Sequence, residues 1–353
     1  MDINLFDFNL PEELIAQTPL KERDESRLMV IDREHRTIEH KIFHDILDYL
    51  HPGDVLVRNN TKVIPARLIG EKCDTHGKVE VLLLNQKSGD VWECLLGNAH
   101  SVHVGSSCSF GDGSLICTCV KEFPEGIRHM EFHYQGIFLE ILDRLGKMPL
   151  PPYIKKQCDD NNDYQTVYAK VPGSAAAPTA GFHFTPELFK AIEAKGITVV
   201  DITLNIGLGT FRPVKVQDTK DHVMHSETFD VSEEAAALLN QAKAEGRRII
   251  AVGTTSVRTL EAEFAKAGKF YPTQDEATAI FIQPGFTYKA VDALITNFHL
   301  PKSTLVMLVS AFMGRKWTLH CYQEAIEQKY RFFSFGDGMF IYGKYDYSHN
   351  LED

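Results

Sequence analysis

The sequence predicts a mixed α/β main domain with a small antiparallel, barrel-like β domain inserted into it. Three observations predict this fold class. Short β runs separated by turn residues fill the stretch from 77 to 146, helices alternate with short apolar strands from Thr185 onward, and mixed segments also precede residue 70. A chain of 353 residues is also long for one core. We therefore expect an α/β domain at 1–70 and 148–353, with the inserted domain at 71–147.

The elements follow from the local patterns in chain order. "RLMVIDR" and "GDVLVRNN" are typical of strands in the first part of the main domain. The inserted domain then has runs such as "GKVEVLLL" and "IRHMEFHY", and its turns include "GDG" and "PEG". Its last segment, "GIFLEILDRLG", fits either a strand or a helix. The inserted domain is thus predicted from turn chemistry at regular spacing.

Helices and strands alternate in the C-terminal half. Thr185 is a good N-cap, with Pro186 at the first helical position and Glu187 near the positive end of the helix dipole. Further helices are predicted at "EEAAALLNQAKAEG" after Ser232, "SVRTLEAEFAKAG", "STLVMLVSAFMG" with Ser303 available as a cap, and "TLHCYQEAIEQKYRF". Strands are predicted at "ITVVDITLNIG", "RRIIAVG", "AIFI", "DALITNF" and "GMFIYG".

Composition excludes several classes of protein. No apolar stretch approaches eighteen residues, and the acidic start fits no secretory or mitochondrial signal, so we expect a cytoplasmic protein without a membrane partner. The formal net charge of −11 would repel nucleic acid unless a local basic patch or specific contacts hold it. The seven cysteines include no Cys-x-x-Cys pair; Cys117 and Cys119 share one strand face, and reduced core thiols are expected. "DHVMHSE", with His222, His225 and Glu227, matches no metal signature, so no metal is expected.

"VGTTSVRT", at 252–259, joins a strand to a helix through a glycine and three hydroxyl residues. Free N–H groups at the helix start, together with Arg258, suit a carboxylate, a phosphate or a ribose edge. The alternative is an ordinary capped turn in which Arg258 pairs with an acid such as Glu261. "NIGLGTFRP" is a second glycine-bearing loop, but it lacks the third glycine and the helix of a dinucleotide fingerprint.

"TNFHLPKST", at 296–304, places His299 and Lys302 just after a predicted strand. Ligands of open α/β sheets bind at the carboxyl ends of the strands. If the predicted strands are parallel, His183, Arg212, Arg258 and His299 all fall near that edge. A lone histidine between phenylalanines is nevertheless more often a buried structural residue than a catalytic one.

Taken together, these loops resemble one family, the S-adenosylmethionine:tRNA ribosyltransferase-isomerases of queuosine biosynthesis. The resemblance runs nearly end to end and in order. Its segments are "LFDFNLPEELIAQTPLKERDESRLMVIDR", "NNTKVIPARL", "YQTVYA", "GSAAAPTAGFHFT", "GLGTFRPV", "VGTTSVRTLE", "TNFHLPKSTLVMLVSAF" and "YRFFSFGDGM". The α/β domain with an inserted barrel-like domain known for this family agrees with the fold predicted above.

The resemblance implies a particular activity. Such enzymes transfer the ribosyl portion of S-adenosylmethionine to the aminomethyl group of a 7-deazaguanine base at the tRNA wobble position, releasing adenine and methionine. Epoxyqueuosine-tRNA is the product. The implied partners are S-adenosylmethionine and tRNA, with no metal or further cofactor, and a monomer is expected.

Residues at the family motifs are candidates by chemical type. Histidines suit proton transfer and acids suit a cationic sulfonium or amine, so the candidate catalytic residues are His183, His299 and Glu227. Flat walls, hydroxyls, an amide, a guanidinium and an acid suit the co-substrate, so the candidate substrate-binding residues are Phe182, Phe184, Asn205, Phe211, Thr254, Thr255, Ser256, Arg258 and Asp337. The candidate tRNA-binding cations are Arg67, Arg212, Lys302 and Arg331. Within "SAAAPTAGFHFTPE", small residues would let a nucleoside approach the backbone beside His183.

This chain also departs from the family pattern. The family usually has Thr-Leu-His-Val-Gly where this chain has "TLNIG", so Asn205 replaces a histidine with an amide that takes up no proton near neutral pH. Basic residues usual after the tryptophan strand are replaced by "WECLLGNAHSVHVG", and "DEA" replaces a glycine before "TAIFI". The alternatives to the family activity are therefore a relative that binds S-adenosylmethionine or tRNA without turnover, or one with another S-adenosylmethionine-dependent reaction. A conventional methyltransferase is disfavoured, because its glycine-rich motif is missing.

Overall fold

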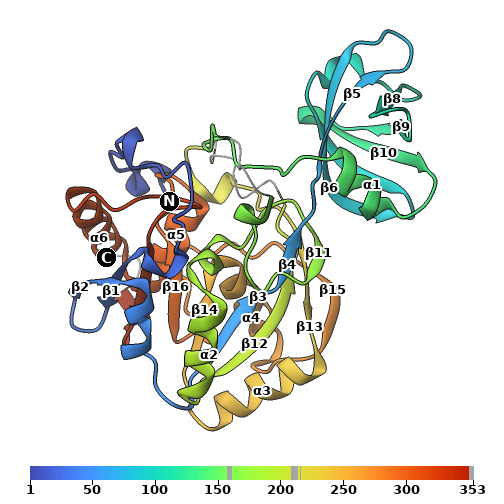
Figure 1. The fold of residues 1–353 in the computed structure, drawn as a ribbon. Helices are drawn as coiled ribbons and strands as arrows, with labels where there is room; N and C mark the ends of the chain where they lie inside the picture. The colour runs from blue at the N-terminus through green and yellow to red at the C-terminus, as the bar shows by residue number, and fades with distance from the viewer. Residues whose placement is uncertain (157–160, 208–213, 215, 350–353) are drawn as a thin grey trace. The chain divides into compact units, whose positions relative to one another are not determined.

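This computed structural model describes residues 1–156, 161–207, 214 and 216–349, which form two compact units (Figure 1). One unit comprises Met1–Asn60, Pro152–Lys170 and Pro178–Asp353, and the other comprises Thr61–Pro151 and Val171–Ala177. The first is a mixed α/β structure and the second contains a closed antiparallel barrel, which confirms the predicted fold class. Which segments fold independently as domains stays a prediction.

Within the described residues, a nine-stranded sheet forms the centre of the α/β unit. Strands β12, β3, β14 and β16 are parallel, β17 is antiparallel to β16, and β1 is parallel to β17. The spatial order is β15 (Thr273–Thr278), β13 (Glu227–Val231), β12 (Thr198–Leu204), β3 (Val55–Asn59), β14 (Ile249–Val252), β16 (Ala293–Asn297), β17 (Gly338–Tyr342), β1 (Arg27–Asp32), β2 (Thr37–Ile42).

This topology gathers chain segments from far apart at one edge of the sheet. The parallel strands β3, β12, β14 and β16 end there, and the oppositely directed β17 and β1 begin there. We call it the carboxyl edge; its strand termini are Asn59, Leu204, Val252, Asn297, Gly338 and Arg27. Loops at such an edge are the usual ligand sites of open α/β sheets.

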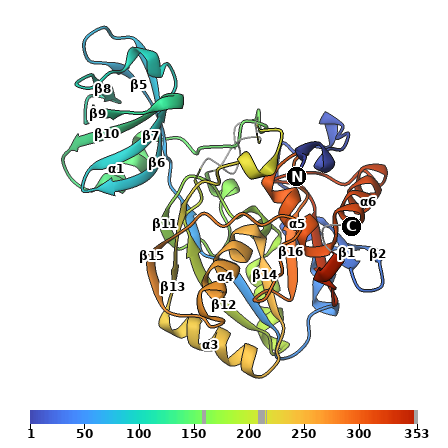
Figure 2. The ribbon, with the colours of Figure 1, turned by 180° about the vertical axis from the view of Figure 1, so that it is seen from behind.

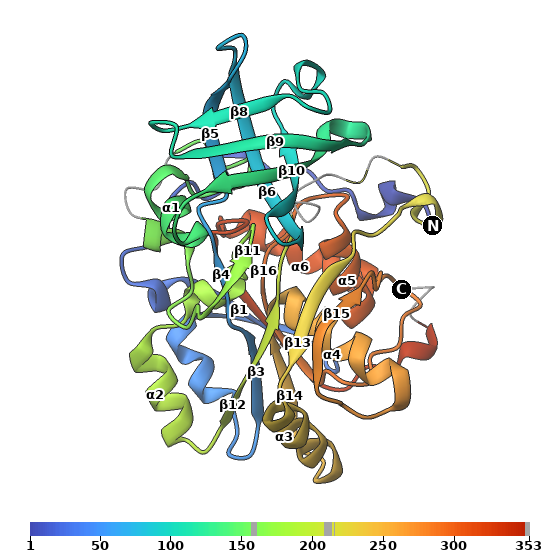
Figure 3. The same cartoon turned by 90° about the vertical axis from the view of Figure 1, so that its right-hand side faces the viewer.

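Helices cover both faces of the sheet: α2 lies on one face, and α3 and α4 lie on the other (Figures 2 and 3). The helices of this unit are α2 (Pro186–Ala194), α3 (Glu233–Ala244), α4 (Gly253–Ala267), α5 (Thr304–Met313) and α6 (Arg315–Glu327). The three predicted N-caps are confirmed, because Thr185, Ser232 and Ser303 accept backbone N–H groups at 3.1, 3.1 and 3.2 Å. None of the described helices is long and apolar enough to cross a membrane.

The α2 face holds a hydrophobic core that anchors the segment before the helix. Phe184, Leu188 and Ile192 pack with sheet residues such as Leu56 and Val252, and all five are buried. Each such side chain contributes about 1.5–3 kcal/mol through removal of apolar surface from water. His183, the neighbour of Phe184, is therefore held at the carboxyl edge by a well-packed layer.

One predicted strand is wrong. "AIFI", at 279–282, forms no strand, and the strand at this place is β15 (Thr273–Thr278). β15 lies at the end of the sheet order, and most of its side chains are exposed or half-buried, so it carries no apolar pattern. Ile282 is buried without strand pairing, which is why the apolar run was misleading.

The second unit contains six antiparallel strands closed into a barrel, as the described residues define it. Around the barrel the order is β10 (Ile127–Tyr134), β7 (Val91–Leu96), β6 (Lys78–Ser88), β5 (Arg67–Lys72), β8 (Ser107–Phe110) and β9 (Leu115–Glu122). The ambiguous segment is helix α1 (Phe138–Leu145), and β4 (Thr61–Val63) pairs in parallel with β11 (Val171–Ser174). Cys117 and Cys119 are buried and free, as predicted.

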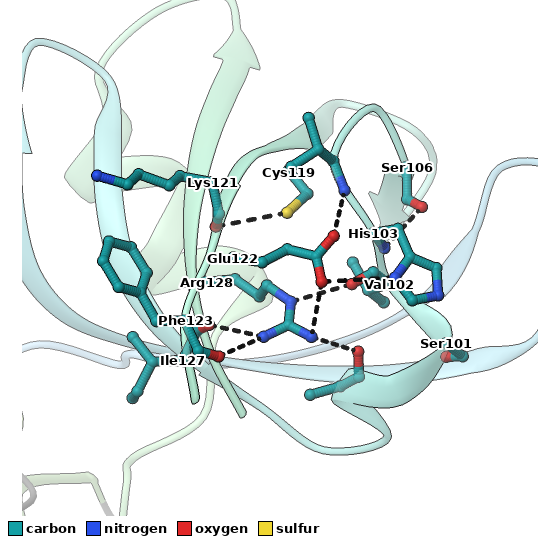
Figure 4. Close-up of polar contacts among 12 residues, drawn as sticks. Ser101, Val102, His103, Ser106, Cys119, Lys121, Glu122, Phe123, Ile127 and Arg128 are labelled. Atoms are coloured by element: carbon teal, nitrogen blue, oxygen red, sulfur yellow. Dashed lines mark hydrogen bonds and ion pairs between the residues drawn. The ribbon is translucent and has the colours of Figure 1, made fainter. Parts of the chain in front are cut away.

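A buried arginine, Arg128, connects several backbone segments of the barrel unit (Figure 4). Arg128, at the start of β10, donates to the carbonyl oxygens of Val102, Phe123 and Ile127 at 3.0, 2.9 and 2.8 Å, and to that of Ala99 at 2.9 Å. Its guanidinium also lies 3.4 Å from the Glu122 carboxylate. One side chain therefore donates to four backbone carbonyl oxygens; those of Ala99 and Ile127 also accept the N–H groups of Val102 and Phe123, so the arginine adds a shared donor to these segments.

We expect Arg128→Met to lower the free energy of unfolding of the barrel unit by about 3 kcal/mol, because buried carbonyls lose charge-assisted hydrogen bonds. Urea unfolding followed by fluorescence of the barrel residue Trp92, in a Trp317→Phe background, measures this loss. Arg144→Met is the matched control, since Arg144 is exposed and, within the described part of the chain, donates one hydrogen bond, to Ser114 Oγ at 2.9 Å. Equal midpoints for the two variants would contradict a clamping role.

Candidate active site at the carboxyl edge

His183 lies at the carboxyl edge, at the end of the short 3-10 helix η8 (Thr179–His183). It is 3 % exposed, and its ring stacks on Phe43 with centroids 4.6 Å apart. Nδ1 of the ring lies 2.7 Å from Ser26 Oγ, and Nε2 lies 3.3 Å from Asn297 Nδ2. Ser26 directly precedes β1 and Asn297 ends β16, so the sheet topology brings the three side chains together.

Asn297 determines the tautomer of His183. Its Nδ2 also donates to the carbonyl oxygen of Phe333 at 3.0 Å, so the amide nitrogen, not the oxygen, faces the imidazole. An amide nitrogen only donates, so Nε2 of His183 accepts and its Nδ1–H donates to Ser26. Burial, and then two nearby arginines, lower the pKa of His183 to about 3. The ring is therefore neutral at pH 7, and Ser26 keeps its hydroxyl proton for another acceptor.

Glycines near His183 are required by their protein neighbours. A Cβ on Gly338 would lie 3.3 Å from His183 Nε2, and a Cβ on Gly181 would lie 2.0 Å from Tyr168 Oη. The second distance is a severe overlap, so a side chain at 181 would displace the half-buried tyrosine. At this position the small residue therefore lets an aromatic ring approach the backbone, where the sequence suggested a nucleoside.

A narrow pocket of about 20 Å³ opens beside His183. The Phe182 and Phe335 rings stack with centroids 5.8 Å apart, and the Arg23 guanidinium lies 5.0 Å over Phe182. Aromatic faces beside arginines suit a flat heterocycle or an anionic group. The volume admits one water-sized group, so the pocket is only a corner of a substrate site. Its lining is Pro19, Leu20, Arg23, Ser26, Phe182, His183, Arg331, Ser334, Phe335 and Gly336.

Asp337 organises the backbone around this pocket. The residue is 2 % exposed, and its oxygens accept the N–H groups of Arg27 at 3.0 Å and Arg331 at 2.7 Å. The Arg331 guanidinium lies 3.6 Å away, as an ion pair. The carboxylate therefore holds Arg331 at the pocket, and its expected place beside a sulfonium or amine stays a prediction.

His299 is a second neutral imidazole at the same edge. It follows the end of β16, and its Nε2 lies 3.0 Å from Thr296 Oγ1. Its backbone N–H donates to Tyr322 Oη at 3.1 Å. Burial lowers the pKa of His299 to about 3. Within the described residues Nδ1 has no hydrogen-bond partner, so one ring nitrogen remains for a ligand in either tautomer.

The start of α4 places a buried ion pair at the carboxyl edge. Arg258 donates through Nη1 to Oε2 of Glu227, and Oε1 of Glu227 accepts the N–H of Gly207 at 3.1 Å. The alternative in which Arg258 pairs with Glu261 is not what the structure shows, because Glu261 accepts N–H groups of a distant loop; the donors are Lys289, Ala290 and Val291. Glu261 satisfies that loop, so the arginine extends to a neighbouring strand.

The hydroxyl residues of "TTS" have different surroundings. Ser256 is fully buried and donates to the carbonyl oxygen of Val252 at 2.8 Å, which closes the first helical turn. Thr255 Oγ1 accepts from Asn59 Nδ2 at 3.2 Å. Thr254 and Thr255 remain 9 % and 8 % exposed, so they reach the surface where Ser256 does not.

The remaining candidates are spread over the two units. Phe184 is fully buried in the α2 core, and Asn205 donates its backbone N–H to Thr228 at 3.0 Å. Lys302 pairs with Asp7 at 3.0 Å, and Arg67, in the barrel, pairs with Glu80 at 3.1 Å. Phe211 and Arg212 lie outside the described residues.

The sequence-based list omits Ser26 and Asn297, the two partners of His183. Both lie in quoted motif segments, "DESRL" and "TNFHLP", and Asn297 ends a predicted apolar strand. A buried amide at a strand terminus was the available signal, because a buried polar side chain needs partners. The absence of a metal stays a prediction. Among the described residues no group of three or more His, Cys, Asp or Glu is placed to hold a metal ion.

Comparison with known proteins shows which family this chain matches. Residues 3–341 match the family described as queuosine biosynthesis protein. The chain is also similar to the crystal structure of S-adenosylmethionine tRNA ribosyltransferase from Thermotoga maritima. The two are 37 % identical, the match covers 96 % of this chain and 99 % of that chain, and the TM-score is 0.54.

Proposed function

This chain belongs to the queuosine biosynthesis protein family, and from that premise we propose that it transfers and isomerises the ribosyl portion of S-adenosylmethionine. The acceptor is the aminomethyl group of a 7-deazaguanine wobble base in tRNA; adenine and methionine leave, and epoxyqueuosine-tRNA forms. The observation that carries this proposal is the similarity over nearly the full length of both chains to a ribosyltransferase of that name. We further propose a cytoplasmic monomer that needs no metal or other cofactor.

The chemistry divides between the two imidazoles. A positively charged sulfonium acidifies its neighbouring carbon, so a base can remove a proton there while the sugar opens and adenine departs. His299, with a ring nitrogen that no described residue occupies, is our candidate for the acceptor of that proton. His183 presents Nδ1–H to Ser26, whose hydroxyl then donates toward the departing adenine. Phe182 supplies a flat wall for a heterocycle.

Because the protein is acidic overall, local cationic side chains must bind the phosphates of the tRNA. Arg331, Arg67 and Lys302 are our candidates for phosphate contacts, each now in an ion pair that phosphate would replace. Phosphate contacts set the position of the nucleic acid, and the wobble base carries the specificity. Binding is therefore expected to weaken steeply as the salt concentration rises.

We expect the wild type to release adenine from S-adenosylmethionine only with tRNA carrying 7-aminomethyl-7-deazaguanine. The Asn205→His variant should change this rate by less than about 100-fold, the smallest usual effect of a lost proton-transfer group. Quantifying adenine by chromatography, with and without the modified tRNA, measures both. An inactive wild type with an active variant would identify a decayed relative, and inactivity of both with intact ligand binding would favour a binding protein.

A further inference from the structure

One edge of the Arg258 guanidinium is buried without partners. Nη1 donates to Glu227, whereas Nε and Nη2 meet no acceptor in the described part of the chain. Arg258 is only 6 % exposed. A buried charged donor without an acceptor destabilises the folded protein. Such a group is therefore usually one that binds a ligand or takes part in catalysis. The Nε and Nη2 hydrogens point side by side, which is the edge that binds a carboxylate through two parallel hydrogen bonds.

The position of this edge is set by the fold. Glu227 is tied through Oε1 to the N–H of Gly207, which follows the end of β12, so the ion pair lies at the carboxyl edge. Helix α4 starts directly after β14 without a side-chain cap, and side chains of a helix tilt toward its N-terminus. Arg258 in the second turn therefore lies near the free N–H groups of the first. Two sources of positive potential converge there.

The charges nearby select a monoanion. Glu227 neutralises one half of the guanidinium and would repel a dianionic phosphate more strongly than a carboxylate. It would also attract a cation placed next to that carboxylate. An arginine and a glutamate side by side therefore match the carboxylate and ammonium of an amino acid zwitterion.

We propose that the Nε and Nη2 edge of Arg258 binds the α-carboxylate of the methionine portion of S-adenosylmethionine. The identity of the ligand rests on the proposed function. The ammonium lies beside Glu227, and Thr254, at the start of α4, faces the same group. Glu227 then positions the co-substrate: each of its oxygens already accepts one hydrogen bond and keeps a second lone pair for the ammonium.

The test compares S-adenosylmethionine with its decarboxylated analogue, by calorimetry on the full chain. Wild type should bind S-adenosylmethionine about 10- to 100-fold more tightly, the usual range for hydrogen bonds to a charged group. Arg258→Gln should bind the two ligands equally and the analogue as wild type does. Arg248→Gln, which breaks a pair with Asp54 at the opposite edge, should keep the full discrimination.

Arg258→Lys is a second variant, used because Arg258→Gln leaves Glu227 without its cation and can fail to fold. Lysine keeps a cation beside Glu227 but lacks the two-donor edge. We expect its discrimination to fall to about threefold or less. Discrimination retained by either Arg258 variant overturns the inference alone. A wild type that binds neither ligand overturns the proposed function and the inference together, so the two failures are distinguishable.

Discussion

His183→Gln is expected to lower the rate of adenine release by about 10²- to 10⁴-fold, the usual contribution of a proton-transfer group. Glutamine can still hydrogen-bond to Ser26 and Asn297, but it neither takes up nor passes on a proton. The loss therefore reports the imidazole chemistry and not the packing. Single-turnover release of adenine in the presence of modified tRNA measures it, because product release does not then limit the rate.

The affinity for S-adenosylmethionine separates chemistry from folding in the same variant. We expect the dissociation constant of the variant for S-adenosylmethionine to change by less than about threefold. The contacts that hold this ligand before the reaction are proposed at other residues of the carboxyl edge, such as Arg258. His35→Gln is the matched control, because His35 is 70 % exposed and pairs with Asp32 at the opposite edge. A His183 variant with the control's rate would make the residue a packing group beneath the pocket.

The features that the sequence predicts well depend on neighbours in the chain. Thr185, Ser232 and Ser303 cap helices through N–H groups three residues away, so the local pattern suffices. The barrel was recognisable from alternation and turn residues for the same reason. β15 was missed because an edge strand needs no apolar face and is defined by its pairing with β13.

The sequence predicts at which edge of the sheet the candidate residues lie, but not which side chains they contact. Ligand sites follow strand ends, so His183 and Arg258 could be assigned to the carboxyl edge in advance. Ser26 meets His183 across 157 residues of chain, and no local pattern encodes that contact. The alternative interpretation paired Arg258 with Glu261, three residues along its own helix, whereas the structure pairs it with Glu227 across 31 residues. Tertiary contacts therefore overrode a local preference.

A pronounced loss of stability on mild acidification is the second large effect that we expect. His183 and His299 each have a pKa of about 3 in the folded protein, against 6.5 for an ordinary histidine. The unfolded chain thus binds two protons between these values that the folded chain does not. The stability that these two neutral rings contribute is present above pH 6.5 and is lost progressively as the pH drops toward 3.

The size of the loss follows from the same two values. Each histidine contributes about 1.4 kcal/mol per pH unit in this window, so lowering the pH from 7 to 5 removes about 2 kcal/mol per residue and about 4 kcal/mol in all. Carboxylates with a lowered pKa, such as Asp218 at about 2, begin to contribute only near their ordinary value of 3.8. Above pH 5 the two buried imidazoles make the largest contribution. Burial also lowers the pKa of the half-buried His222, which adds to the loss, whereas Asp32 raises the pKa of the exposed His35, which opposes it.

Urea unfolding at pH 7 and pH 5, followed by circular dichroism at 222 nm, measures this loss in the helix-rich α/β unit. His183→Gln and His299→Gln should each remove about half of the pH dependence, because glutamine binds no proton in either state. The double variant should lose most of the pH dependence in this range, even though each substitution lowers stability at pH 7. A double variant with the full wild-type pH dependence would mean that both imidazoles take up protons in the folded protein. Neutral imidazoles at the carboxyl edge are what the proposed proton transfers require, so the same titration also tests the starting state of the reaction.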